Sequence, residues 1–129
     1  MNIDIGYKIL ILLAMIFCHI VDDYYSQGIL ASMKQKEWWK NNAPDSLYKH
    51  DYLMALFMHS FSWTFSIMFL PTLCIVILGG IWRPVVFIAN IVLHMIVDDL
   101  KANKRKINLV VDQSCHIVQI LATWLVMMF

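Results

Sequence analysis

The longest apolar stretch of the sequence covers residues 52–78 and contains no Asp, Glu, Lys or Arg. A membrane-spanning helix needs about 20 mostly apolar residues, so this stretch is long enough to cross a bilayer. Pro71 lies inside it and predicts either a kink or a break in the helix. A soluble domain of 129 residues has one core, which could not hide this much apolar surface from water.

Three further stretches, residues 7–27, 81–100 and 107–129, are also largely apolar, although each carries His and Asp. The whole chain is 60% hydrophobic and 15% charged, compared with about 45–50% and about 25% in soluble domains. We therefore predict an all-α polytopic membrane protein. Its single transmembrane domain covers residues 1–129, with four transmembrane helices in a bundle at about 7–27, 52–78, 81–100 and 107–129.

The longest connection contains a segment of mixed character at about residues 29–42. Two adjacent tryptophans, Trp38 and Trp39, lie there among lysines and isolated aliphatic residues. This mixture predicts a short amphipathic helix in the headgroup region of the membrane. A polar loop with two interfacial tryptophans is the alternative.

Basic residues are unevenly distributed along the chain. Eight of the ten lie in two loops: Lys34, Lys36, Lys40, Lys49, and Lys101, Lys104, Arg105, Lys106. The positive-inside rule predicts that both loops are cytoplasmic, so both termini face away from the cytoplasm. The net charge of only +1 argues against nucleic-acid binding.

Each predicted helix carries one histidine at a similar depth. A rise of 1.5 Å per residue puts these histidines roughly 9–13 Å from the cytoplasmic end. They are His19, His59, His94 and His116. Three of them have an aspartate four residues away, on the same helix face: Asp23, Asp98 and Asp112. Lipid cannot solvate these side chains, so they must face the interior of the bundle.

Histidine and carboxylate at this spacing are typical of helical metal sites. We predict a divalent metal, with zinc the best match and manganese or iron as alternatives. Two ions, or one ion with Asp–His pairs around it, fit the number of ligands. The predicted metal ligands are His19, Asp23, His94, Asp98, Asp112 and His116, with His59 as a seventh ligand or catalytic general base. A proton or ion pathway and a metal-free structural network remain alternatives.

Taken together, these motifs resemble a domain-of-unknown-function family of small four-helix phage and bacterial integral membrane proteins. The pattern consists of His19-x3-Asp23-x3-Gln27, then His59, then His94-x3-Asp98 and Asp112-Gln113-x2-His116. A more distant likeness is to bacterial inner-membrane metal-dependent hydrolases. The resemblance implies a four-helix protein of the bacterial inner membrane, often virus-encoded. Asp22 departs from the pattern, because that family more usually has an apolar residue beside the aspartate.

Three functions are compatible with these features. The first is a metal-dependent hydrolase that acts on an amphiphilic, lipid-like substrate at the cytoplasmic leaflet, with Lys101 and Arg105 binding its anionic head group. The second is an ion or proton channel or transporter lined by the same polar stripes, at the axis of a homo-oligomer. The apolar end of the last helix, after Thr123, favours a closed site over a pore. The third is a phage-encoded effector that binds a host protein.

Overall fold

The computed structural model describes residues 3–129, and within this range every regular element is a helix. The predicted all-α class is therefore confirmed. The elements are α1 (Ile5–Ile20), a π-helical turn (Val21–Ser26), α2 (Leu30–Met33), α3 (Lys36–Asn42), a 3₁₀ turn (Ser46–Tyr48), α4 (Asp51–Ile77), α5 (Pro84–Ala102) and α6 (Leu109–Met128).

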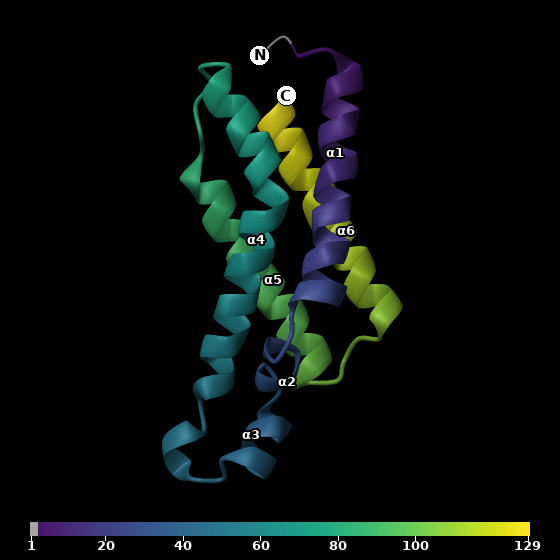
Figure 1. The fold of residues 1–129 in the computed structure, drawn as a ribbon. Coiled ribbons are helices and arrows are strands. Elements are labelled where there is room, and N and C mark those ends of the chain that lie inside the picture. Colours follow the sequence, from purple (N-terminus) through teal and green to yellow (C-terminus); the bar gives the residue numbers. More distant parts are fainter. Residues whose placement is uncertain (1–2) are drawn as a thin grey trace.

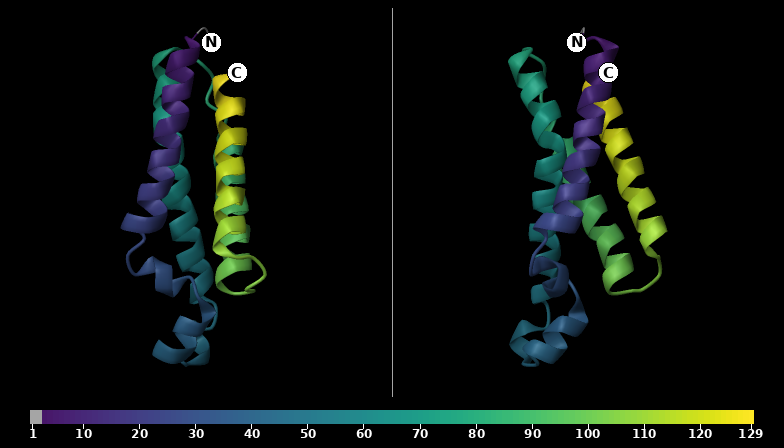
Figure 2. Two further views of the ribbon diagram at one scale, coloured as in Figure 1. Left: turned by 90° about the vertical axis from the view of Figure 1, so that its right-hand side faces the viewer. Right: turned by 45° about the vertical axis from the view of Figure 1, so that its right-hand side comes forward.

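The four long helices form an up-and-down bundle, in which α1 and α5 run opposite to α4 and α6 (Figure 1). The start of α1 and the end of α6 lie at one end, and α2 and α3 lie at the other. In the left-hand view of Figure 2, α1 and α4 form one layer and α5 and α6 the other. Helices α4 and α6 each contact all three of the other long helices.

Three helical stretches of the described chain are long and apolar enough to cross a membrane: Ile5–Ser26, Ser46–Ile77 and Leu109–Met128. Phenylalanines on the outer face of α4, among them Phe65 and Phe69, are about half exposed, as expected of a lipid-facing surface. Helix α5 is 19 residues long, but any 18-residue stretch of it contains Asp98, Asp99 and Lys101. The predicted fourth crossing therefore stays a prediction.

Local sequence accounts for where the long helices begin. Asp4 and Asn108 cap α1 and α6, because each side chain accepts a hydrogen bond from a backbone N–H of the first turn. Helix α5 begins at Pro84 rather than near residue 81, since proline is favoured at the first helical position. Helix α4 continues through Pro71, so the predicted alternative of a break there is wrong.

The interior of the bundle is divided into an apolar half and a polar half. The apolar half lies toward the start of α1 and the end of α6, where buried side chains such as Met15, Ile67 and Ile120 pack together. Lipid tails are as apolar as these side chains, so in a bilayer close packing would hold this half together rather than transfer out of water. The polar half lies toward α2 and α3 and contains the histidines.

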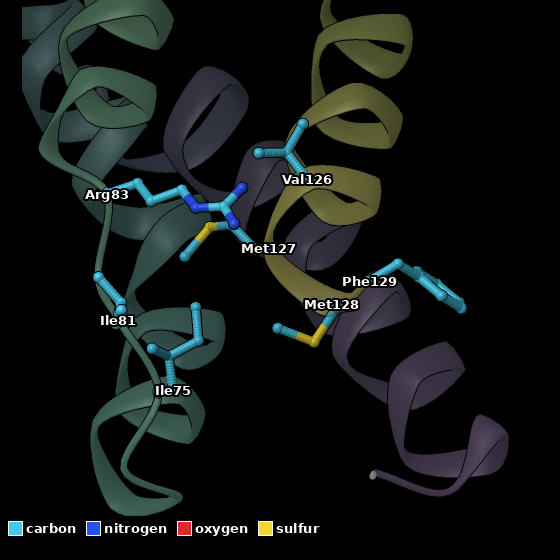
Figure 3. A pocket seen from close by; sticks show the side chains of 8 residues that line it. Ile75, Ile81, Arg83, Val126, Met127, Met128 and Phe129 are labelled. Atoms are coloured by element: carbon cyan, nitrogen blue, oxygen red, sulfur yellow. The ribbon is translucent and has the colours of Figure 1, made fainter. Parts of the chain in front are cut away.

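A cavity of about 240 Å³ lies at the apolar end. Arg83 projects into it from the segment before α5 toward Met127 on α6, and Ile75 and Phe129 also line it (Figure 3). None of the predicted site residues lines this cavity, so it is separate from the predicted metal site.

The interfacial segment, residues 29–42, is two short helices rather than the single helix predicted. Helix α2 ends before Lys34, and Gln35 has extended backbone angles of φ −98° and ψ 126°. Asn103 of the α5 end holds the chain on either side of this break. Its Nδ2 donates to the Lys34 carbonyl (3.0 Å), and its Oδ1 accepts from the Lys36 N–H (2.7 Å). These long-range contacts override local helix propensity.

Candidate metal centre

Four histidines from four different helices meet in the polar half of the bundle. His19, His59, His94 and His116 come from α1, α4, α5 and α6, and none is more than 2% exposed. The rings of His94 and His116 stack with centroids 4.3 Å apart, and His59 lies 5.0 Å from His94. The histidines thus lie at one level, as their depths along the helices predict.

The three aspartates predicted from the four-residue spacing join them. His19 Nδ1 lies 3.5 Å from Asp23 Oδ2, and His94 Nε2 lies 3.8 Å from Asp98 Oδ1. On α6, His116 Nε2 lies 3.5 Å from Asp112 Oδ1. We call these seven residues the His/Asp cluster: His19, Asp23, His59, His94, Asp98, Asp112 and His116.

A π-helical turn brings Asp23 into this cluster. The wider winding over Val21–Ser26 points two adjacent aspartates inward toward α4. Asp23 Oδ1 lies 3.3 Å from His59 Nε2, whereas Asp22 Oδ1 accepts a hydrogen bond from Ser62 Oγ at 2.9 Å. Asp23 is therefore the member of the cluster, and Asp22 ties the end of the first helix to α4.

Two groups of side chains within the described chain could hold a metal ion. The first is Asp23, His59 and His94, and the second is His94, Asp98 and His116. In the first group, His59 Nε2 lies 3.3 Å from Asp23 Oδ1 and 3.2 Å from His94 Nε2. Tetrahedral zinc with bonds of about 2.0–2.1 Å requires donor atoms roughly 3.3–3.4 Å apart. Two of the three donor pairs in the first group therefore match the spacing of a zinc site, and all three donor atoms lie within 4.8 Å of one another.

The second group is slightly wider. Asp98 Oδ1 lies 3.8 Å from His94 Nε2 and 3.5 Å from His116 Nε2. Both groups use His94. A single nitrogen of His94 can bind only one ion, so the two groups are alternatives for that nitrogen.

Two lysines hold the outer carboxylates. Lys34 Nζ lies 2.6 Å from Asp98 Oδ2, and Lys101 Nζ lies 2.6 Å from Asp112 Oδ2. Each carboxylate turns its other oxygen toward His116 Nε2, at 3.5 Å in both cases. The lysines thus fix the carboxylates, with Oδ1 of each facing His116 and Oδ2 of Asp98 also 3.4 Å from His59 Nε2. Lys34 was not predicted as a site residue, because it reaches Asp98 across 64 positions of sequence.

Several buried atoms of the cluster make no hydrogen bond within residues 3–129. They are Asp112 Oδ1, His94 Nδ1 and both ring nitrogens of His116. A buried polar atom left unsatisfied costs about 1–3 kcal/mol, so such atoms are normally met by water or an ion. This chemistry fits a bound cation together with its water.

Asp112, a predicted ligand, lies outside both metal-binding groups. So does His19. Its Nδ1 accepts a hydrogen bond from Trp63 Nε1 at 2.8 Å, so its Nε2 carries the proton and donates to Gln113 Oε1 at 3.1 Å. Both ring nitrogens are therefore in use. Trp63 lies four residues after His59 and so shares its face of α4. This spacing is the sequence signal that places Trp63 near His19.

The predicted head-group residues, Lys101 and Arg105, line a cavity beside the cluster. This cavity measures about 250 Å³ and is also lined by Lys34, Gln35 and Asp98. We call it the head-group cavity. It reaches the cluster through Asp98, whose other oxygen faces His116.

A hydrogen-bonded network lies on the apolar side of the cluster. Asn90 Nδ2 donates to Thr123 Oγ1 at 2.9 Å, and Gln119 Nε2 donates to Asn90 Oδ1 at 2.8 Å. These three side chains, all less than 10% exposed, satisfy one another. The apolar half of the core lies beyond them, so the polar stripe ends here.

Comparisons of the chain with protein-family models, with curated proteins and with solved structures give no match. The resemblance drawn from the motifs therefore stays a prediction, and the geometry of the cluster is the basis for a function.

Proposed function

We propose that this chain is an integral membrane metalloenzyme that holds one zinc ion in the His/Asp cluster and hydrolyses an amphiphilic substrate at the cytoplasmic leaflet. The donor spacing of Asp23, His59 and His94 carries the proposal. Two histidines and one carboxylate are also the ligand type of many catalytic zinc sites, which leave the fourth position open for water.

The charges support one ion rather than two. Asp23, Asp98 and Asp112 bring three negative charges, and Lys34 and Lys101 return two. With neutral histidines, one divalent cation turns this single negative charge into a single positive one, which a bound anion can balance. A second divalent cation would leave three positive charges in a low-dielectric interior.

The topology supports four crossings with the cluster near the cytoplasm. Helices α4 and α6 run in the same direction, and α5 returns the chain between them (Figure 1). If α4 and α6 both cross the membrane, α5 crosses as well, and its charged end lies at the α2–α3 end of the bundle. Eight of the ten basic residues belong to the loops at that end. The positive-inside rule then makes that end cytoplasmic, as in a bacterial inner-membrane protein.

The cluster also contains groups suited to proton transfer. Zinc supplies an activated water and polarises the oxygen of the scissile bond when bound. The ring of His116 stacks on the ligand His94, and its Nε2 lies 3.5 Å from Asp112 Oδ1. We assign the Asp112–His116 pair as the general base, with Lys101 holding the far oxygen of Asp112 in place.

Metal analysis of protein purified in mild detergent without chelator tests the proposal. We expect one zinc per chain in the wild type and none in H59A or H94A. His50 lies in an exposed loop, so H50A is the matched control and keeps its zinc. H19A tests whether His19 belongs to the ligand set, as the sequence predicts. Because both nitrogens of His19 are engaged in hydrogen bonds, we expect H19A to keep its zinc. A wild type without zinc, or zinc retained in both H59A and H94A, would overturn the proposal.

Hydrolysis is tested separately with p-nitrophenyl phosphate and p-nitrophenyl butyrate as probes in the same detergent. We expect activity that is lost on chelation, and H116A that keeps its zinc but loses at least about 100-fold in rate, the size of a general-base contribution. No hydrolysis of either probe by the zinc-loaded wild type would contradict the enzymatic part.

The channel alternative predicts ion or proton flux in liposomes. The satisfied network of Asn90, Gln119 and Thr123 and the apolar core beyond it argue against a pore through one bundle. Flux that disappears in H94A would favour the channel over the enzyme.

A further inference from the structure

The head-group cavity is lined by three cationic side chains and by Asp98 of the His/Asp cluster. Lys34 enters it from the interfacial segment, Lys101 from the last turn of α5, and Arg105 from the loop that follows α5. Its single carboxylate is Asp98, which Lys34 already neutralises at 2.6 Å. The cavity is therefore a positively charged vestibule next to the proposed zinc ligands.

Arg105 is the cation of this cavity that remains available to a ligand. Lys34 and Lys101 are paired with carboxylates of the cluster, whereas no ion pair within the described residues involves Arg105. The backbone of Arg105 has φ 51°, in the left-handed region that favours glycine, and it is the one non-glycine residue of the described chain with a positive φ. Such conformations cluster at ligand-binding sites.

The charge of the assembled site selects the type of anion. This step rests on the proposed function. Three carboxylates face Lys34, Lys101, Arg105 and one zinc ion, which leaves two positive charges with neutral histidines. A phosphate monoester carries between 1.5 and two negative charges near neutral pH, like a phosphorylated side chain, and is recognised well by arginine. A zwitterionic phosphodiester would leave the site positively charged.

The size of the cavity limits how much of the ligand it holds. Pockets that enclose a whole small molecule measure about 300–1,000 Å³, whereas this one measures about 250 Å³. A phosphate and the atoms next to it fit, and a hydrocarbon tail does not. The tail would remain in the surrounding lipid.

We propose that the head-group cavity binds the terminal phosphate of a phosphate monoester, with Arg105 as its principal contact and the zinc centre beside it. An amphiphile of this class, such as a lipid with a terminal phosphate, is the substrate that this arrangement favours.

Calorimetric titration of the zinc-loaded protein in a non-ionic detergent tests the proposal with three probes. Dodecyl phosphate carries the terminal phosphate and a tail, dodecylphosphocholine carries the same tail with a zwitterionic head, and inorganic phosphate carries no tail. We expect dodecyl phosphate to bind and dodecylphosphocholine not to bind. R105Q should bind dodecyl phosphate about tenfold more weakly, as expected for one charge-assisted hydrogen bond.

R83Q is the matched control, because Arg83 lines the separate cavity at the opposite end of the bundle. It should bind dodecyl phosphate like the wild type. Equal binding of dodecyl phosphate by R105Q and the wild type, or equal binding of the two dodecyl probes, would overturn the proposal. Inorganic phosphate binding as tightly as dodecyl phosphate would overturn the lipid part.

Zinc content measured on the same samples separates the two proposals. Arg105 makes no ion pair with a carboxylate of the cluster, so R105Q should contain as much zinc as the wild type. Zinc-loaded protein that binds no dodecyl phosphate overturns the phosphate site and leaves the metal centre standing. A protein that contains no zinc but still binds dodecyl phosphate through Arg105 overturns the metal centre and leaves the phosphate site standing.

Discussion

Asn103 joins the interfacial segment to the end of α5, and its removal should release that segment. The side chain makes two hydrogen bonds to backbone groups more than 60 residues away, one to the Lys34 carbonyl and one from the Lys36 N–H. It is thus a direct link between the interfacial segment and the bundle. The side chain of Lys34 extends from the same segment to Asp98 of the cluster.

The size of the effect follows from these two bonds. A hydrogen bond contributes about 0.5–1.5 kcal/mol net, so N103A should lose about 1–3 kcal/mol of docking free energy. Since 1.4 kcal/mol is tenfold, the population with the segment undocked should rise by between about five- and 150-fold. The Lys34–Asp98 pair stabilises the docked segment equally in both proteins, so it does not change this ratio.

Amide hydrogen exchange of peptides that cover residues 29–42 measures this population. N103A should exchange faster than the wild type by the factor above, with no change in the peptides of α4 or α6. Asn42 provides the control, because its Nδ2 donates to the Trp38 carbonyl within α3 and makes no link to α5. If N103A exchanges like the wild type, or N42A accelerates the segment equally, the segment is not held by Asn103.

Three further outcomes are expected. K34M removes the cation from the buried Asp98 carboxylate and should lower the free energy of unfolding of metal-free protein by about 3–5 kcal/mol. K40M breaks an exposed ion pair and should change this free energy by at most about 1 kcal/mol. Equal effects of the two variants in denaturation curves would contradict this reasoning. W63F leaves His19 Nδ1 without its donor and should cost about 1–3 kcal/mol in the same assay, and an unchanged midpoint would show that this hydrogen bond does not matter. Chelation should lower the apparent free energy of unfolding of the wild type, because a ligand at 100 times its dissociation constant contributes about 2.7 kcal/mol. A chelator that leaves this free energy unchanged would argue against a metal ion in the His/Asp cluster.

The sequence pattern predicted the helical class and the convergence of the histidines, because both depend on periodicity within one helix. His94 and Asp98, or Asp112 and His116, lie four residues apart and share a face regardless of what surrounds them. The level of the histidines followed equally from the helical rise.

The contacts between distant segments were not predictable in the same way. Lys34 looked like one of several loop lysines until the fold placed it against Asp98. The spacing of His19 to Asp23 predicts a ligand, whereas the fold engages both of its ring nitrogens in hydrogen bonds with Trp63 and Gln113. The break at Gln35 depends on Asn103. Each of these features is set by tertiary contacts that override local preference.

The π-helical turn has a consequence for how sequences related to this one can differ in length. Deleting one residue from Val21–Ser26 would restore ordinary winding, in which adjacent residues lie about 100° apart, so Asp22 and Asp23 could not both point toward α4. Either the Asp23–His59 contact or the Asp22–Ser62 hydrogen bond would then be lost. Substitutions at the exposed Tyr25 disturb neither contact. The length of this short segment is therefore more constrained than most of its side chains. An insertion or deletion there would disrupt the cluster, whereas a substitution at Tyr25 would not.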